Sequence, residues 1–425
     1  MKDLLTFLSE SPSRFHAVDN LGRELTEAGY TRLAESEKWD IVPGGKYYVT
    51  RNGSALLAFR VPKADFAGFM ISASHSDAPS FHIKENAELS GPEKYIRVNT
   101  ERYGGVLCAP WFDRPLTFSG RVLVKTETGV ETRLVYVDKD LLLIPSVAIH
   151  MNRNANDGYK YDPKCDTIPL MGLGEAKGAM RSIIAKAAGC AVEDVLGHDL
   201  FLCIRQKGFV WGANDEFVSA PALDDLQCAY GCFRGFMDAT ESESLPIFAL
   251  LDNEEVGSMT KQGADGTFLS DVVERICSAL GRDKYSAVAN SFLVSADNAH
   301  AVHPNHPEYT DATHRPVMNG GVVIKHGTRY ATDGAAQAIF TALCNKAGVP
   351  VQHFSNRSDL AGGGTLGNIS NSHLSMNTVD IGLAQLAMHS CLETGGVEDT
   401  DNLVRAMTAF YSTSFRETNG MFTLN

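Results

Sequence analysis

Three carboxylates follow directly after an apolar run in the segment Asp252-Asn-Glu-Glu255. The preceding residues, 246–251, are continuously apolar and bounded by breakers, which predicts a short buried strand. The acids would therefore stand at the carboxyl end of a strand, the edge at which open α/β sheets bind their ligands. Adjacent glutamates that leave a core strand repel each other, and a metal ion is the simplest compensation.

The two glutamates would have different tasks at a metal site. If the segment is extended, Glu254 and Glu255 point to opposite sides of the chain. One of them could then bind a metal while the other faces the water that the metal activates. The alternative is a solvated acidic turn, which two glutamates alone would favour, so the rest of the chain has to decide.

Polar side chains follow two further apolar runs. Residues 68–73 lead into His75 and Asp77, and residues 291–296 lead into Asp297. The spacing of His75 and Asp77 suits a metal site, because a ligating imidazole is usually oriented by a second carboxylate or carbonyl. A lone histidine beside an aspartate is nevertheless more often structural.

Three more candidates lie elsewhere in the chain. Asp224 opens a predicted helix, where an acid could merely cap the helix or could give one oxygen to each of two metals. Lys325 ends an apolar strand, where it could meet an anionic ligand or be an ordinary surface lysine. His389 lies in the apolar segment 383–392, which we expect to be helical.

The elements that must position these residues alternate between strands and helices. We predict two N-terminal helices within residues 3–29, a hairpin that turns at Asn52-Gly53, and later helices that begin near residues 222 and 268. This alternation predicts an α/β fold.

The pattern of apolar and polar residues changes between residue 81 and about residue 218. Short alternating segments separated by turn residues predict an antiparallel β-rich insertion with one helix at 174–188. Residues 152–164 are expected to form an exposed loop. His150 closes an apolar run that we interpret as a strand, where a buried structural histidine is the default.

The composition excludes several classes of function. The 425 residues carry 51 acidic against 38 basic side chains and a net charge of −13, which argues against nucleic acids and anionic membrane surfaces as partners. No apolar run approaches the ~20 residues that span a bilayer, and the N-terminus does not resemble a signal peptide. Nine scattered cysteines fit reduced thiols and a cytoplasmic location. Two of them, Cys228 and Cys232, are expected in the core rather than in a zinc site.

Ordered motifs along the whole chain resemble the aspartyl aminopeptidase family of dinuclear zinc exopeptidases. The motifs are Ser11-Pro-Ser-Arg-Phe-His-Ala-Val18, Tyr47-Tyr-Val-Thr-Arg-Asn-Gly-Ser54, His75-Ser-Asp77, Asp252-Asn-Glu-Glu-Val-Gly-Ser258, Ser295-Ala-Asp-Asn-Ala-His-Ala-Val-His-Pro-Asn305 and Gln385-Leu-Ala-Met-His-Ser390. Spacing alone could not assemble one site from such distant residues. The choice of site residues therefore rests on this resemblance.

The resemblance implies two divalent metal ions per subunit, with Zn²⁺ preferred and Co²⁺ or Mn²⁺ as alternatives. Asp224 would bridge the ions, and the other ligands would complete two opposing shells. Glu254 would be the general base, and Asp77 would orient a histidine ligand. The implied metal ligands are His75, Asp224, Glu255, Asp297 and His389.

The resemblance also implies a fold and an assembly. The fold would be an α/β zinc-exopeptidase catalytic domain with a mixed central sheet, formed by residues 1–83 and 218–425. A β-rich dimerisation domain, residues 84–217, would interrupt it. Dimers would assemble into a tetrahedral dodecamer, and His150 would enter the active site of a neighbouring subunit. Lys325 would lie beside the pocket for the first side chain of the substrate.

The implied activity is a metal-dependent aminopeptidase that releases single N-terminal residues from peptides, with a preference for Asp or Glu. Asp225, Asn298 and His326 stand where the family commonly has other residues, so a neutral or broad preference is the alternative. A carboxypeptidase or amide deacetylase with the same metals is a rival enzyme. A catalytically silent assembly or cargo protein is a rival of another class, although such a protein would be free to lose the base and the ligands.

Overall fold

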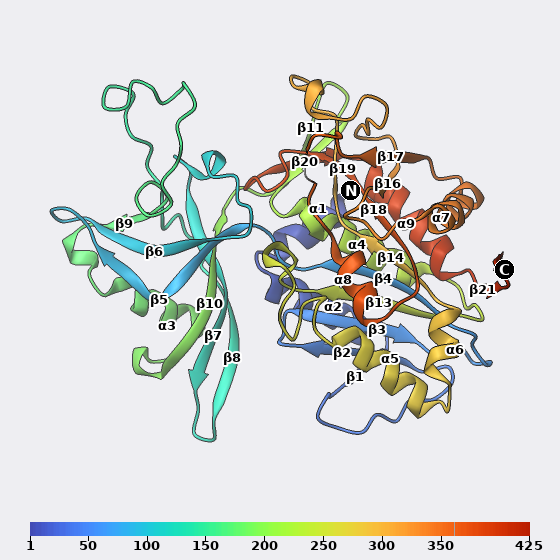
Figure 1. Ribbon diagram of the computed structural model, residues 1–425. Coiled ribbons are helices and arrows are strands. Elements are labelled where there is room, and N and C mark those ends of the chain that lie inside the picture. The colour runs from blue at the N-terminus through green and yellow to red at the C-terminus, as the bar shows by residue number, and fades with distance from the viewer. Residues whose placement is uncertain (361) are drawn as a thin grey trace.

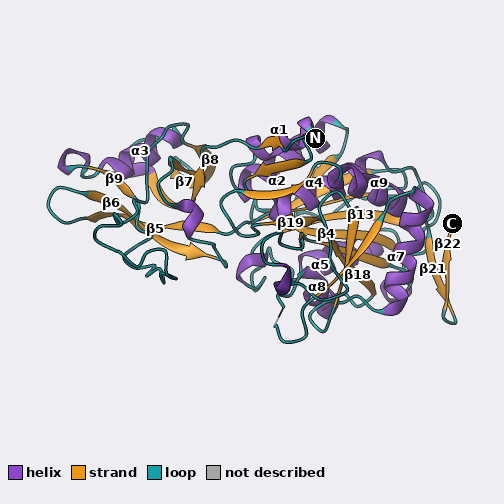
Figure 2. Ribbon diagram, turned by 90° about the horizontal axis from the view of Figure 1, so that it is seen from above, coloured by secondary structure: helices purple, strands orange, loops and turns teal. Residues whose placement is uncertain are grey.

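The chain forms two lobes, which are separated by a narrow waist (Figures 1 and 2). The computed structural model describes residues 1–360 and 362–425. The larger lobe is built around a nine-stranded mixed sheet, and the smaller lobe around a six-stranded antiparallel sheet. The mixed α/β architecture agrees with the fold predicted from the sequence.

Four neighbouring parallel strands form the centre of the large sheet: β13, β4, β14 and β18. The predicted hairpin joins β2 to β3, and Asn52 and Gly53 at its turn have φ angles of 60° and 66°, which this residue pair adopts readily. In sheet order the strands are β1 (Thr31–Leu33), β2 (Lys46–Arg51), β3 (Ala55–Arg60), β13 (Leu245–Leu251), β4 (Phe69–His75), β14 (Phe292–Ala296), β18 (Asn377–Gly382), β16 (Val322–His326) and β17 (Val351–Ser355).

Helices cover both faces of this sheet, and each face has its own hydrophobic core. One face packs against α1 (Lys2–Glu10), α2 (Arg14–Glu27), α4 (Leu223–Asp238), α7 (Gly334–Ala347) and α9 (Asp399–Tyr411). The other face packs against α5 (Phe268–Ala279), α6 (Lys284–Ala289) and α8 (Leu366–His373). None of the helices described here is long and apolar enough to cross a membrane.

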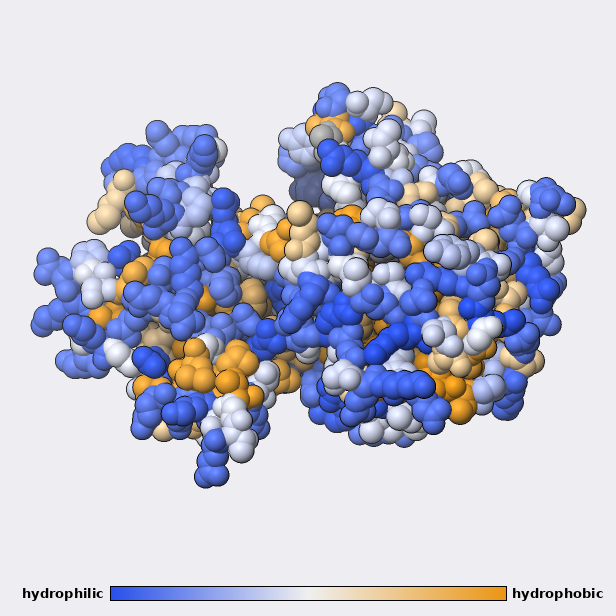
Figure 3. Space-filling view, turned by 60° about the horizontal axis from the view of Figure 1, so that its bottom comes forward, coloured by the Kyte–Doolittle hydropathy of each residue, from blue (hydrophilic) through white to orange (hydrophobic). Residues whose placement is uncertain are grey.

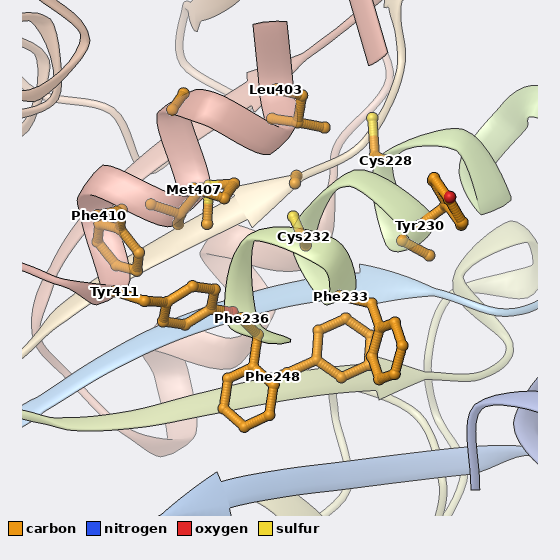
Figure 4. Packing of buried hydrophobic residues seen from close by; sticks show 14 of the residues in the cluster. Cys228, Tyr230, Cys232, Phe233, Phe236, Phe248, Leu403, Met407, Phe410 and Tyr411 are labelled. Atoms are coloured by element: carbon orange, nitrogen blue, oxygen red, sulfur yellow. The ribbon is translucent and has the colours of Figure 1, made fainter. Parts of the chain in front are cut away.

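The core between α4, α9 and the sheet is rich in aromatic side chains (Figure 4). Phe233 of α4 lies with its ring centre 5.4 Å from that of Phe248 in β13, and Phe236 lies 5.5 Å from Tyr411 of α9. Burying each such side chain contributes about 1.5–3 kcal/mol. This core fixes α4, and with it the acids at the start of α4, over the carboxyl ends of the strands.

The smaller lobe is β-rich, as the alternating segments predict. Its strands are β5 (Ser80–Ser90), β6 (Ile96–Tyr103), β7 (Leu116–Lys125), β8 (Val130–Tyr136), β9 (Leu170–Gly172) and β10 (Val195–Ile204), and its helix is α3 (Ala179–Ala188). A separate hydrophobic core lies between this sheet and α3. The division of the chain at residues 84 and 217 stays a prediction.

A third, five-stranded sheet brings distant segments together beside the carboxyl ends of the large sheet. One of its strands precedes Asp224, one follows Asp297, and two flank His389. Its strands are β11 (Phe209–Trp211), β12 (Phe217–Ala220), β20 (Glu393–Gly396), β19 (Ala384–Leu386) and β15 (Ala299–His300). A C-terminal hairpin pairs β21 (Phe415–Thr418) with β22 (Met421–Leu424).

Two predictions of local structure in the site segments were wrong. Residues 383–392 are not helical, because β19 pairs with β15 and β20 and is followed by a turn in which His389 has a φ angle of 68°. Glu254 and Glu255 are not extended but lie in a 3₁₀ turn, η4 (Glu254–Val256). In both cases the backbone conformation depends on partners that are distant in the sequence.

Two predictions in the smaller lobe also need correction. His150 does not close a buried strand: strand pairing stops at Ile144, Pro145 has no N–H to donate, and residues 145–150 are exposed. The helix predicted at 174–188 begins only at Ala179. Gly178, just before the helix, has a φ angle of 78°, which is not helical, so the helix starts after this residue.

Candidate metal centre

Three neighbouring parallel strands deliver polar side chains to one edge of the large sheet. His75 is the last residue of β4, Glu254 and Glu255 follow β13, and Asp297 follows β14. Because β13, β4 and β14 are parallel and adjacent, their carboxyl ends meet at the same place. The structure therefore brings these residues together at one edge of the sheet.

Asp224 lies between two imidazoles with one oxygen facing each of them. Its Oδ1 is 3.4 Å from Nε2 of His75, and its Oδ2 is 3.5 Å from Nε2 of His389. The backbone of Asp224 and Asp225 departs from helical geometry, and the peptide bond between them is cis. The regular helix thus begins after the two acids, whose carboxylates face the strand ends.

Three overlapping groups of side chains each bring their ligand atoms within 4.8 Å of one another. Asp224, His75 and Glu255 each belong to two of these groups. The groups are His75, Asp224, Asp225 and Asp297; His75, Glu254 and Glu255; and Asp224, Glu255 and His389. All five residues that the resemblance implies as ligands lie in this cluster.

The donor set fits divalent cations. All the candidate ligand atoms are imidazole nitrogens or carboxylate oxygens, which are ligands that zinc takes in proteins. Oδ1 of Asp224 and Oε1 of Glu255 are buried without a hydrogen-bond partner among the described residues. Because buried polar atoms are normally satisfied, these unpaired oxygens fit a site that holds a cation.

Burial and mutual repulsion shift the pKa values of the cluster. Burial is the largest cause that raises the pKa of Glu254 to about 7. Burial, followed by the charge of Asp224, raises the pKa of Glu255 well above its ordinary value. Burial alone would lower the pKa of His75, but the surrounding carboxylates outweigh it and raise that pKa well above its usual range. A bound cation would replace these protons.

Asp77 lies behind both His75 and the η4 turn. Its backbone carbonyl is 3.0 Å from Nδ1 of His75, and its Oδ1 is 3.4 Å from the same nitrogen. Its carboxylate also accepts the backbone N–H groups of Glu254 and Glu255, at 3.1 and 3.2 Å. Asp77 can therefore orient the imidazole and the two glutamates together.

A buried network that the sequence analysis did not predict extends from Asp77 to the smaller lobe. Tyr103, the last residue of β6, donates its hydroxyl hydrogen to Oδ2 of Asp77 at 2.7 Å. Arg14 of α2 donates to the Tyr103 hydroxyl at 2.7 Å and to Asp252 at 2.8 Å. The smaller lobe thus contacts, through Tyr103, a residue that lies directly behind the cluster.

Glu393 of β20 is a second residue to which the sequence analysis assigned no role. Its side chain is buried and accepts the backbone N–H of Asp224 at 2.9 Å and that of His389 at 2.6 Å. One carboxylate therefore connects two segments that are far apart in the chain. No local signal in the sequence indicates these contacts, because both partners are main-chain groups.

Lys325 lines a small cavity of about 100 Å³ beside the cluster, together with Glu254, Asp297 and His389. It is buried, with its Nζ 3.2 Å from Oδ2 of Asp297. Burial would lower the pKa of Lys325, but the charge of Asp297 together with those of other neighbouring groups outweighs burial and raises it. His150, in contrast, lies on an exposed loop of the smaller lobe and does not line this cavity.

Comparisons with known proteins identify relatives of this chain. The family model of aminopeptidase I zinc metalloproteases (M18) matches residues 7–411. A protein of Clostridium acetobutylicum, named probable M18 family aminopeptidase 2, is 42% identical over 424 residues, which cover 97% of this chain and 98% of that protein.

Solved structures resemble the whole chain as well. The structure of the Ape4 and Nbr1 complex matches with a TM-score of 0.93 and 33% identity over 97% of this chain and 85% of that one. The yeast mApe1 dodecamer matches with a TM-score of 0.85 and 30% identity over 96% of this chain and 95% of that one. The likeness therefore covers both lobes.

Proposed function

Since the chain belongs to the family of aminopeptidase I zinc metalloproteases (M18), we propose that its buried cluster is a dinuclear zinc centre that releases single N-terminal residues from peptides. Metal-dependent aminopeptidase activity follows from the family itself. The number of ions, the roles of the residues and the substrate preference are the proposal. The observation that supports it most strongly is Asp224, whose two oxygens face two different imidazoles.

In the proposed centre, Asp224 would hold two cations, one through each carboxylate oxygen. His75 and His389, on its two sides, would then each bind a different cation. Oε2 of Glu255 lies 3.4 Å from Nε2 of His389, so Glu255 would bind the same cation as that histidine. Oδ1 of Asp297 lies 3.8 Å from Nε2 of His75, so Asp297 would bind the other cation. Asp77 would hold the ring of His75 through Nδ1, so that Nε2 faces the metal. Zn²⁺ is the expected ion, and Co²⁺ or Mn²⁺ are the alternatives.

Glu254 is the proposed general base. It lines the cavity and lies within the cluster, where a carboxylate can take a proton from a water and return it. Bound zinc supplies a lowered pKa for the attacking water and polarisation of the scissile carbonyl. Glu254 would accept the proton of that water and later deliver a proton to the leaving amine.

The free α-amine of the substrate would bind among the carboxylates of the cluster, which makes the enzyme an exopeptidase. A carboxypeptidase or deacetylase with the same residues would accept peptides whose amino terminus is blocked, and this enzyme would not. The silent assembly protein is disfavoured, because the base and every proposed ligand lie in one cluster.

The proposed preference for Asp and Glu rests on Lys325. The buried ammonium group of Lys325 could pair with the carboxylate of the first substrate side chain while it keeps its contact with Asp297. An apolar side chain would offer that ammonium no partner. The cost of the unpaired buried charge would lower kcat/KM for such substrates relative to acidic ones. A neutral or broad preference remains the alternative, in which the Lys325 charge serves only to hold Asp297.

The test compares kcat/KM for peptides that begin with Asp, Glu, Leu or Lys, in wild type and in Lys325→Met. We expect the wild type to favour the acidic peptides and Lys325→Met to lower the acidic-to-neutral ratio at least tenfold. Lys346→Met, at an exposed position of α7, is the matched control and should not alter the ratio. A wild type that favours Leu, or an unchanged ratio in Lys325→Met, would show that Lys325 is not the selector.

We also propose that the smaller lobe mediates homo-oligomerisation, through dimers to a dodecamer. This lobe exposes large apolar side chains, among them Val130, Leu134 and Leu196, and Figure 3 shows hydrophobic groups gathered on its surface. The exposed His150 would then reach the active site of a neighbouring subunit. A cytoplasmic location stays a prediction, supported by nine free cysteines in the described chain.

A further inference from the structure

Three histidines from different segments meet at the edge of the large sheet, outside the cluster described above. Nε2 of His326 in β16 lies 2.9 Å from Nδ1 of His353 in β17, and their ring centres are 5.1 Å apart. The ring centre of His314, on the loop before β16, lies 6.3 Å from that of His326 and 6.4 Å from that of His353.

These histidines are separate from the candidate metal centre. Lys325 and Phe354 line the cavity of that centre, whereas His326 and His353 are their neighbours along β16 and β17. Successive residues of a strand point to opposite faces, so both imidazoles lie on the face away from the cavity. None of the three histidines belongs to the groups of ligand atoms around Asp224, and their own ligand atoms do not all lie within 4.8 Å of one another, so His314 has to move for all three to bind one ion.

The His326–His353 contact places two potential ligand atoms side by side. In this hydrogen bond one ring nitrogen donates its hydrogen to the lone pair of the other. A metal ion can bind both nitrogens once the hydrogen of the donor ring has moved, through solvent, to the other nitrogen of that ring, so that both imidazoles stay neutral. Burial, followed by the neighbouring histidines, lowers the pKa of His326, and burial likewise lowers that of His353, which favours the neutral, ligating form of both rings.

His314 is held in a way that suits a third ligand. Its Nδ1 lies 3.2 Å from Oδ1 of Asp311, an arrangement in which the carboxylate orients the imidazole and the other ring nitrogen binds metal. The Asp311 carboxylate is itself fixed by the backbone N–H groups of Thr313 and His314, each at 2.9 Å. The second nitrogen of His314, Nε2, is thereby left for a ligand.

The separations approach those of a tetrahedral site. With Zn–N bonds of about 2.0–2.1 Å, the ring centres of imidazole ligands stand roughly 5 Å apart. The His326–His353 pair already has this separation. His314 would have to move inward by roughly an ångström on the same geometry, and its side chain is 45% exposed on a loop and has room to do so.

We propose that His314, His326 and His353 form a further metal site, which binds one Zn²⁺ or a similar borderline ion such as Ni²⁺, with water as the fourth ligand. Three neutral imidazoles without a thiolate are a donor set that suits these ions. The ion would cross-link the edge strand β17, its neighbour β16 and the loop that carries His314. The site lies outside the proposed catalytic centre and does not depend on it.

The test is a zinc titration of the metal-depleted protein against a chromophoric chelator. The wild type should bind one more Zn²⁺ per chain than His326→Ala or His353→Ala, and His314→Ala should weaken that additional ion at least tenfold. His373→Ala is the matched control, because this histidine bonds to Asp265 on another part of the surface and should leave the wild-type number of ions. Equal numbers of ions in wild type and His326→Ala would overturn the proposal.

A second measurement does not depend on the variants. Anomalous scattering at the zinc absorption edge, from zinc-soaked crystals of the wild-type protein, should give a peak between the three rings. Diffraction data that lack this peak while the centre around Asp224 is loaded would also overturn the proposal. Unaltered zinc affinity in His314→Ala would exclude the three-histidine site.

Discussion

Two buried carboxylates hold the backbone around the candidate metal centre. Glu393 accepts the N–H groups of Asp224 and His389, and Asp77 accepts those of Glu254 and Glu255. A ligand's side chain can be placed accurately only if its own backbone is fixed. At the scale of single residues, the geometry of the centre therefore depends on acids that need not bind the metal themselves.

The role of Glu393 can be tested by shortening its side chain. Glu393→Ala leaves two buried N–H groups without acceptors and frees the segments of Asp224 and His389, so we expect the zinc affinity of the centre to fall about 10–100-fold. Glu393→Gln keeps one acceptor oxygen and should lose less. The measurement is the loss of peptidase activity against increasing chelator.

Glu398→Ala supplies the control for this experiment, because Glu398 is an exposed acid two residues after the end of β20. It should behave as the wild type in the chelator titration. If Glu393→Ala loses activity at the same chelator concentration as the wild type, the carboxylate does not support the metal ligands.

At the scale of elements, the sequence predicts the strands of the large sheet but not the conformation of the segments that follow them. The apolar runs that end at Ala73, Leu251 and Ala296 are local signals, and each forms the expected strand. β19 and β20 are short, and their other partners, β15 and β12, lie far away in the chain, so the segment of His389 could not be told from a helix by its apolar residues. Contacts such as Glu393 to main-chain N–H groups leave no local pattern at all.

Tyr103 tests whether the smaller lobe supports the centre through β6. Tyr103→Phe removes the hydroxyl that donates to Asp77 and accepts from Arg14, so we expect the free energy of unfolding to fall by about 1–3 kcal/mol. The turnover number should also fall, because Asp77 fixes the η4 turn, while the metal is retained. Chemical denaturation and steady-state kinetics on one sample measure both effects.

Tyr95→Phe is the matched control, because this tyrosine of the same lobe is 48% exposed. It should change stability by no more than about 0.5 kcal/mol and leave turnover unaltered. The supporting role of β6 would be refuted by a Tyr103→Phe variant as stable and active as the control.

At the scale of the whole molecule, the site of one chain lacks His150. This residue lies on the exposed loop of the smaller lobe and does not line the cavity beside the cluster. The resemblance implies that the corresponding residue of a neighbouring subunit enters the site. The assembly would then be part of the active site, and separated subunits should lose activity.

Complementation tests this arrangement. His150→Ala should have reduced activity with unaltered metal content, and Glu254→Gln should have little activity alone. After subunit exchange, a mixed dimer pairs one chain that keeps Glu254 with another that supplies His150, so some activity should return. Each variant passed through the same exchange by itself is the control. If the mixture recovers no more activity than these controls, His150 does not act across the interface.

The central claim is that Glu254 acts as the base and Glu255 as a ligand at a metal-dependent peptidase centre, and the substitution of each adjacent glutamate separates the two roles. We expect Glu254→Gln to lower the turnover number about 10²–10⁴-fold while its metal content equals that of the wild type. Glu255→Gln, the matched control, should lose metal. Near-normal turnover in metal-loaded Glu254→Gln would contradict the mechanism proposed for this centre.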